Sequence, residues 1–137
     1  MSATAFAVLG FIAWTLLLII INEVMRSYLV LCGRKRADSF QPDGADVSPF
    51  AHRLARAHAN CYESFPLIGG VLLLALVTEQ TDVTDPLALW LLGLRVAQGL
   101  THLSSTAIPA VILRFLFFAG QLVIVAWWVV RFLAAWI

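Results

Sequence analysis

Charged residues are scarce in this chain. Only 12% of its 137 residues are Asp, Glu, Lys or Arg, and the formal net charge is +1. A soluble domain carries about 25% charged residues. The near-neutral balance supplies no broad basic surface, so we expect no nucleic-acid partner. What replaces the charge is apolar: 61% of the residues are hydrophobic and the mean hydropathy is +0.90, which indicates one small domain that crosses a membrane several times.

Cysteine is nearly absent as well. Cys32 and Cys61 are too few for a disulfide framework, and each is expected to be a small buried residue in or beside an apolar helix. The N-terminus has no basic stretch and no small-residue cleavage site after a short apolar core. Its apolar run, residues 3–21, is about 19 residues long, enough to span a hydrocarbon core of about 30 Å. We therefore expect a retained first helix and no removable signal peptide.

Four hydrophobic segments divide the chain, at about residues 4–32, 49–78, 86–103 and 109–136. Ser48 followed by Pro49 is typical of a helix start, and Asp85 followed by Pro86 repeats the pattern before the third segment. No internal repeat or low-complexity tract interrupts them. The prediction is an all-α integral membrane four-helix bundle in which residues 1–137 form a single domain.

The basic residues orient this bundle. Arg34, Lys35, Arg36, Arg53 and Arg56 flank the first connection, whereas the second carries three acidic residues and no Lys or Arg. The positive-inside rule then places the first connection in the cytosol and both termini on the opposite side. The compact loops and the lack of a retention signal favour a bacterial inner membrane over the endoplasmic reticulum.

A polar stripe marks the second segment. Arg56, Asn60 and Glu63 are spaced to share one helix face, with His52 one turn earlier. The apolar remainder, residues 65–77, covers only about 20 Å, so Asn60 and Glu63 must lie at membrane depth. A charge there costs on the order of 3 kcal/mol toward lipid. The stripe should therefore face the bundle interior, a wet cavity or a ligand with carboxylate, amine and peptide groups.

Two further segments carry polar residues at helical spacing. The third has Arg95, Gln98 and His102 on one face, and the fourth has Arg114 with Gln121 two turns deeper. Interhelical bonding and ligand contact both explain the first group. Arg114 could either snorkel to headgroups or contact a ligand.

The motif Arg53-x-x-Arg56-Ala-His58-x-Asn60-x-x-Glu63-x-x-Pro66 resembles that of the MAPEG superfamily, the membrane-associated proteins in eicosanoid and glutathione metabolism. Leu94-Arg95-x-x-Gln98-Gly99 and Arg114-x-x-Phe117-Phe118-x-Gly120 are weaker matches in the third and fourth segments.

This resemblance implies a homotrimer of four-helix protomers that binds glutathione as co-substrate between neighbours, near the cytosolic face. By the same resemblance Arg114 is the catalytic residue that activates the thiol, because a nearby guanidinium favours the nucleophilic thiolate. The implied glutathione-binding residues are Arg34, Arg36, Arg53, Arg56, His58, Asn60, Glu63, Gln98 and His102. Either Arg34 or Arg36 matches the basic residue at the end of the first helix.

Three functions remain open at this point. The leading one is a glutathione-dependent membrane transferase or peroxidase whose second substrate is a lipophilic electrophile that enters from the lipid. The chain departs from the eicosanoid-type pattern, however, because the region around Val96 and Leu100 offers no tyrosine. A non-catalytic lipid-binding or scaffold member of the superfamily is therefore the second hypothesis. The third is a small proton-coupled multidrug exporter with Glu23 as its proton carrier, a scheme in which the Arg56-Asn60-Glu63 stripe has no role.

Overall fold

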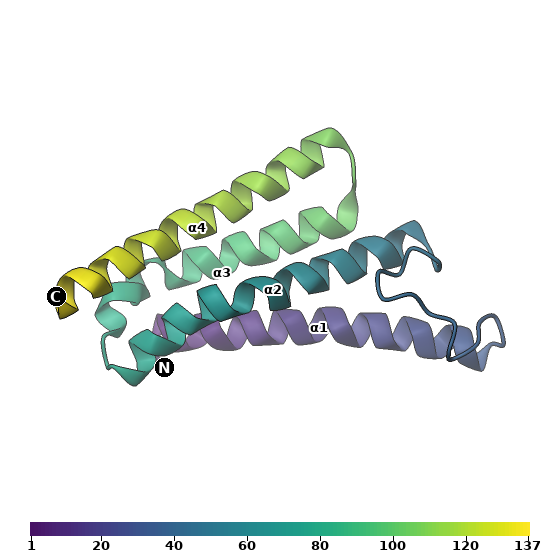
Figure 1. Cartoon of the computed structure of the whole chain (residues 1–137), viewed down its shortest axis with the longest axis horizontal. Helices are drawn as coiled ribbons and strands as arrows, with labels where there is room; N and C mark the ends of the chain where they lie inside the picture. Colours follow the sequence, from purple (N-terminus) through teal and green to yellow (C-terminus); the bar gives the residue numbers. More distant parts are fainter.

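The computed structural model describes the whole chain, and it consists of four helices: α1 (Ala3–Leu31), α2 (Pro49–Val77), α3 (Thr81–Ser104) and α4 (Ile108–Trp136). The helices alternate in direction, so both chain termini lie at one end of the molecule and the first connection lies at the other (Figure 1). This confirms the predicted all-α four-helix architecture. By length and composition, α1, α2 and α4 are able to cross a membrane.

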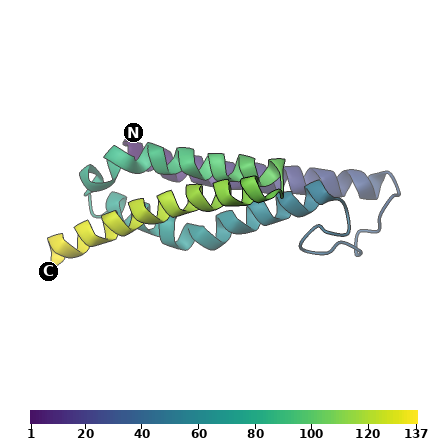
Figure 2. The ribbon, with the colours of Figure 1, turned by 90° about the horizontal axis from the view of Figure 1, so that it is seen from above.

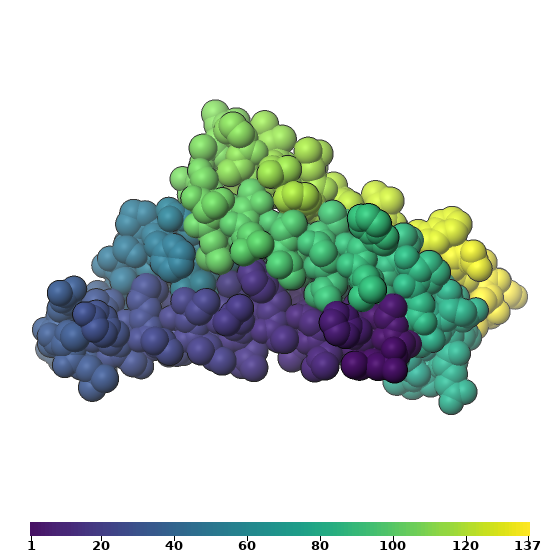
Figure 3. All heavy atoms as spheres, turned by 180° about the vertical axis from the view of Figure 1, so that it is seen from behind, coloured from purple at the N-terminus to yellow at the C-terminus, as the bar shows by residue number.

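α3 occupies the centre of the arrangement. It packs against α1, α2 and α4, whereas α1 and α4 do not touch each other. Seen from above, α1 extends beyond the ends of α3 and α4 and carries the first connection with it (Figure 2). From behind, α1 and α3 lie side by side and form one continuous face (Figure 3). The end that carries the first connection is called the loop end below.

The buried core is built from one stripe of each helix. Leu18, Leu54, Leu72 and Leu91 are fully buried, and Trp128 of α4 is fully buried in the same cluster. Large apolar residues on the opposite faces of α1 and α4 are exposed, as expected for helices whose outer surface meets lipid or another chain.

Of the two helix starts predicted from Ser-Pro and Asp-Pro, the structure has the first and not the second. Ser48 caps α2, because its hydroxyl accepts a hydrogen bond from the Ala51 amide at 3.0 Å, and Pro49 takes the first helical position. α3 differs from expectation: it begins at Thr81, and Pro86 lies inside the helix rather than at its start. Within this extra turn, Thr84 is fully buried and its hydroxyl contacts that of Thr4 on α1.

Asp85 therefore caps the N-terminus of α1, whereas its position before Pro86 suggests a cap for α3. Its carboxylate accepts hydrogen bonds from the backbone amide of Thr4 at 2.8 Å and from the Thr4 hydroxyl at 2.6 Å. The Thr84 hydroxyl lies 2.6 Å from that of Thr4. A carboxylate at a helix N-terminus is favoured by the helix dipole. The first turns of α3 are thereby joined to the start of α1.

Candidate functional site

The polar residues at the loop end enclose a basic cavity between α2 and α4. Its volume is about 270 Å³, and none of its lining residues is apolar or acidic. The lining residues are His52, Arg53, Arg56, His102, Thr106 and Arg114. We call this space the basic cavity. Three guanidinium groups without a carboxylate make it a site for an anion.

A second cavity continues from the first toward the middle of the bundle. It measures about 230 Å³ and shares His102 and Arg114 with the basic cavity. Its full lining is Asn60, Gln98, His102, Val111, Arg114, Phe115 and Phe118. We call it the deep cavity. The two together form a polar entrance followed by a part-apolar floor, and Arg114 stands where they meet.

Local bonding fixes one wall of the entrance. The Arg53 Nε donates a hydrogen bond to the Leu103 carbonyl at 2.8 Å. That carbonyl belongs to the last turn of α3, where backbone acceptors lack partners within the helix. Arg53 thus ties the first turns of α2 to the end of α3. No hydrogen bond or ion pair within the chain engages the side chain of Arg56 or Arg114.

A buried polar network supports the floor. Arg95, only 1% exposed, donates from Nη1 to the Asn60 Oδ1 at 2.6 Å. The Gln98 Nε2 donates to the same oxygen at 3.1 Å, and the Gln121 Nε2 donates to the Gln98 Oε1 at 2.9 Å. Gln121 is fully buried. The network links α2, α3 and α4 at the depth of Asn60.

The Arg95 guanidinium has no acidic partner. Its Cζ lies 5.0 Å from the centroid of the Phe11 ring and 5.9 Å from that of Phe118. Its Nε and Nη2 make no hydrogen bond within the chain. Cation–π contact and one amide oxygen therefore provide the stabilisation of this buried charge.

Six of the ten residues predicted for the site are brought together. The side chains that line the two cavities are Arg53, Arg56, Asn60, Gln98, His102 and Arg114. Arg95 and Gln121 were noted for their spacing but were not predicted as site residues. Their polarity within apolar helices was the available signal, and only the packing of α3 against α2 and α4 reveals which residue they serve.

The two basic candidates after α1 lie elsewhere. Arg34 and Arg36 are exposed in the first connection, and neither lines the cavities. Arg36 pairs with Asp38 at 3.0 Å. A second pair, Lys35 with Asp46 at 2.7 Å, closes the connection on itself, and the Lys35 ammonium holds the pKa of the Asp46 carboxyl below its usual value.

The last two candidates are on α2 but point away from the cavities. His58 lies beside Tyr62, with ring centroids 5.5 Å apart, and Tyr62 lines a groove shared with α1. Glu63 is exposed. At about 100° per residue, Glu63 projects from a ridge of α2 with Asn60 on one side and Tyr62 on the other.

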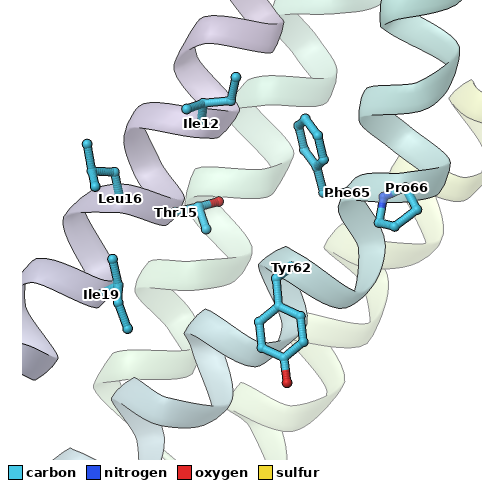
Figure 4. A pocket seen from close by; sticks show the side chains of 7 residues that line it. All are labelled: Ile12, Thr15, Leu16, Ile19, Tyr62, Phe65 and Pro66. Carbon is cyan, nitrogen blue, oxygen red and sulfur yellow. The ribbon is translucent and has the colours of Figure 1, made fainter.

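An apolar groove lies along that other flank, between α1 and α2. Its volume is about 390 Å³. Figure 4 shows its side chains, which stand on the two neighbouring helices α1 and α2; they are Ile12, Thr15, Leu16, Ile19, Tyr62, Phe65 and Pro66. We call it the apolar groove. It and the basic cavity flank α2 on opposite sides, so a molecule in one does not meet a molecule in the other within a single chain.

Comparisons with known proteins give one result. The model of the MAPEG family matches residues 4–134, almost the whole chain. Searches of the curated proteins and of the solved structures found no match.

Proposed function

Because this chain belongs to the MAPEG family, whose members bind glutathione and lipophilic substrates in membranes, we propose that it is a glutathione-dependent transferase or peroxidase for lipophilic electrophiles. The observation that carries the proposal is the basic cavity. It combines Arg53, Arg56 and Arg114 without any acidic lining residue, and it adjoins a cavity with amide groups.

The chemistry of the lining suits a small acidic peptide. Glutathione has two carboxylates, and guanidinium groups bind carboxylates through paired hydrogen bonds. Arg56, which has no partner within the chain, supplies such a fork at the entrance, and Asn60 offers an amide for a peptide group. Ligand pockets usually measure about 300–1,000 Å³. Either cavity alone is below that range, but they share Arg114 and His102, so one extended ligand can occupy both.

Arg114 is the proposed catalytic residue. Its guanidinium stabilises the thiolate of glutathione over the thiol, and the thiolate is the nucleophile. In transfer, the sulfur attacks an electrophilic carbon, a sulfur–carbon bond forms, and the leaving group departs with the bonding electrons. In peroxide reduction, the sulfur attacks a peroxide oxygen, the O–O bond breaks, and the other oxygen leaves as an alkoxide that takes up a proton. The thiol of a second glutathione then attacks the resulting sulfenic acid, which forms the disulfide and releases water. The same activated sulfur serves both reactions.

The second substrate requires a neighbouring chain in this proposal. The apolar groove is a suitable site for a lipophilic molecule, but it lies on the other side of α2 from the basic cavity. Glu63 on the ridge between them is exposed, although a carboxylate facing lipid is costly. A homotrimer in which a second copy covers this ridge removes that cost. It also brings the groove of one chain near the basic cavity of the next.

The test is a glutathione titration of the detergent-purified protein, followed by the ultraviolet absorbance of the thiolate at neutral pH. A saturable signal is expected, and Arg56→Ala should weaken binding by removing an unpartnered guanidinium from the cavity. Arg131→Ala is the matched control, because it removes the same charge from an exposed position near the far end of α4. Equal binding by wild type and Arg56→Ala would refute the site assignment. Glutathione binding without a thiolate signal would favour a non-catalytic lipid-binding member.

A further inference from the structure

The direction of the hydrogen bonds around Asn60 can be determined from its partners. A guanidinium only donates hydrogen bonds. The atom of Asn60 that lies 2.6 Å from the Arg95 Nη1 must therefore be the carbonyl oxygen, Oδ1. Gln98, which approaches the same oxygen at 3.1 Å, must present its NH₂ group there. The Gln98 carbonyl oxygen is then directed to Gln121.

The other end of the network fixes the same direction independently. Gln121 lies 3.0 Å from the backbone carbonyl of Phe117, which only accepts, so its Nε2 is at that position. The same Nε2 also lies 2.9 Å from the Gln98 Oε1. A donor-only group at one end and an acceptor-only group at the other thus agree. Turning any one amide over would bring two donors or two acceptors together.

We propose that Arg95 and Gln121 are positioning residues that hold Asn60 as a hydrogen-bond donor toward the deep cavity. This deepens the proposed function and rests on it. Both lone pairs of the Asn60 oxygen are engaged by Arg95 and Gln98, whereas its Nδ2 makes no hydrogen bond within the chain. The site therefore presents N–H and no acceptor at this point. It selects a carboxylate or carbonyl oxygen of the ligand and rejects an ammonium group.

The buried charge of Arg95 makes the Asn60 amide a stronger hydrogen-bond donor. Arg95 is only 1% exposed, and its short hydrogen bond to the Asn60 oxygen withdraws electron density from the amide. Neither Arg95 nor Gln121 lines the basic cavity or the deep cavity. Their effect on a ligand must then pass through Asn60 and, for Gln121, through Gln98.

Asn60→Asp separates the donor role from a structural one. A carboxylate still accepts from Arg95 and Gln98, so the thermal midpoint of the ligand-free protein should stay equal to that of the wild type or rise. The edge that faces the cavity becomes an acceptor with negative charge, so glutathione affinity should fall about tenfold or more. Asn60→Ala is the contrast: it leaves Arg95 without its acceptor and should lower both the midpoint and the affinity.

A second pair of variants, at Arg95, tests the direction of the Asn60 hydrogen bonds without altering Asn60. Arg95→Lys retains a donor-only group, so glutathione affinity should stay within about threefold of wild type. Arg95→Met removes one of the two donors that hold the Asn60 oxygen and leaves Gln98 alone to fix its direction, so binding should weaken more than in the Lys variant. Equal affinities of the Lys and Met variants, or wild-type affinity in a folded Asn60→Asp protein, would overturn the inference. Failure of the wild-type protein to bind glutathione would instead refute the proposed function, and the midpoint of Asn60→Asp would still report the network.

Discussion

On the proposed function, replacing Arg114 by Ala should remove most of the thiolate formed from bound glutathione. Arg114 borders both cavities, and no carboxylate among their lining residues offsets its charge. At about 4 Å and an effective dielectric constant of about 20, a guanidinium and a thiolate attract by about 4 kcal/mol. Partial exposure reduces this to about 2–3 kcal/mol, which lowers the pKa of the glutathione thiol from about 8.5 to about 6.5.

The corresponding signal is large. At pH 7 the thiolate fraction of bound glutathione rises from about 3% to about 75% over that pKa change. Arg53 and Arg56 remain in the variant, so we expect the thiolate absorbance at saturating glutathione to fall at least about fivefold rather than vanish.

The control removes the same charge from the same helix. Arg131 is exposed near the other end of α4, where its guanidinium lies 5.7 Å from the Trp127 ring centroid. Arg131→Ala should leave the thiolate absorbance unchanged. If Arg114→Ala binds glutathione and still shows the full thiolate signal, the reasoning is wrong, and another group activates the thiol.

Three further results are expected. Asp85→Ala should lower the thermal midpoint, because two hydrogen bonds from Thr4 to a carboxylate are lost, each worth about 1.5–3 kcal/mol; an unchanged midpoint in a melting experiment would contradict this. Gly99→Ala should destabilise by about 1–3 kcal/mol, since its Cβ would lie 2.6 Å from the Trp14 ring, whereas Gly93→Ala meets nothing within 4 Å and should stabilise α3 by about 0.5–1 kcal/mol. Glutathione affinity should fall as salt is raised, because an anion in a basic cavity is screened; titrations at low and high salt would test it.

The fold could be read from the sequence because apolar length and helix-start signals are local properties. Ser48 and Pro49 mark the start of α2 as predicted. The start of α3 could not be read in this way. Asp85 and Pro86 have the local pattern of a helix start, but a tertiary partner, Thr4 on α1, takes the Asp85 carboxylate and the helix extends back to Thr81. The helix whose N-terminus a carboxylate caps depends on tertiary packing, and the local sequence alone does not predict that packing.

The site residues also separate into those that helix periodicity predicts and those that it does not. Residues at helical spacing on one face of α2, such as Arg56 and Asn60, were predicted from periodicity and lie at the cavities. His58, two positions before Asn60, projects from another flank because a helix turns about 200° over two residues. Arg34 and Arg36 are in an irregular connection, where spacing predicts no direction. Their contribution to glutathione binding stays a prediction.

The network around Arg95 could serve to hold the helices together or to orient Asn60 toward a ligand. The two roles predict different effects of an Arg95 substitution on stability and on glutathione affinity. A buried guanidinium with no carboxylate partner is costly, and replacing buried ionic groups by apolar residues of similar size is often neutral or stabilising. If the network served only to hold α2, α3 and α4 together, Arg95→Met should weaken the protein. If Arg95 sets the donor direction of Asn60, the same variant should keep or gain stability while it loses affinity for glutathione. The position of this cation beneath the deep cavity, on the one amide that α2 presents there, favours the second reading.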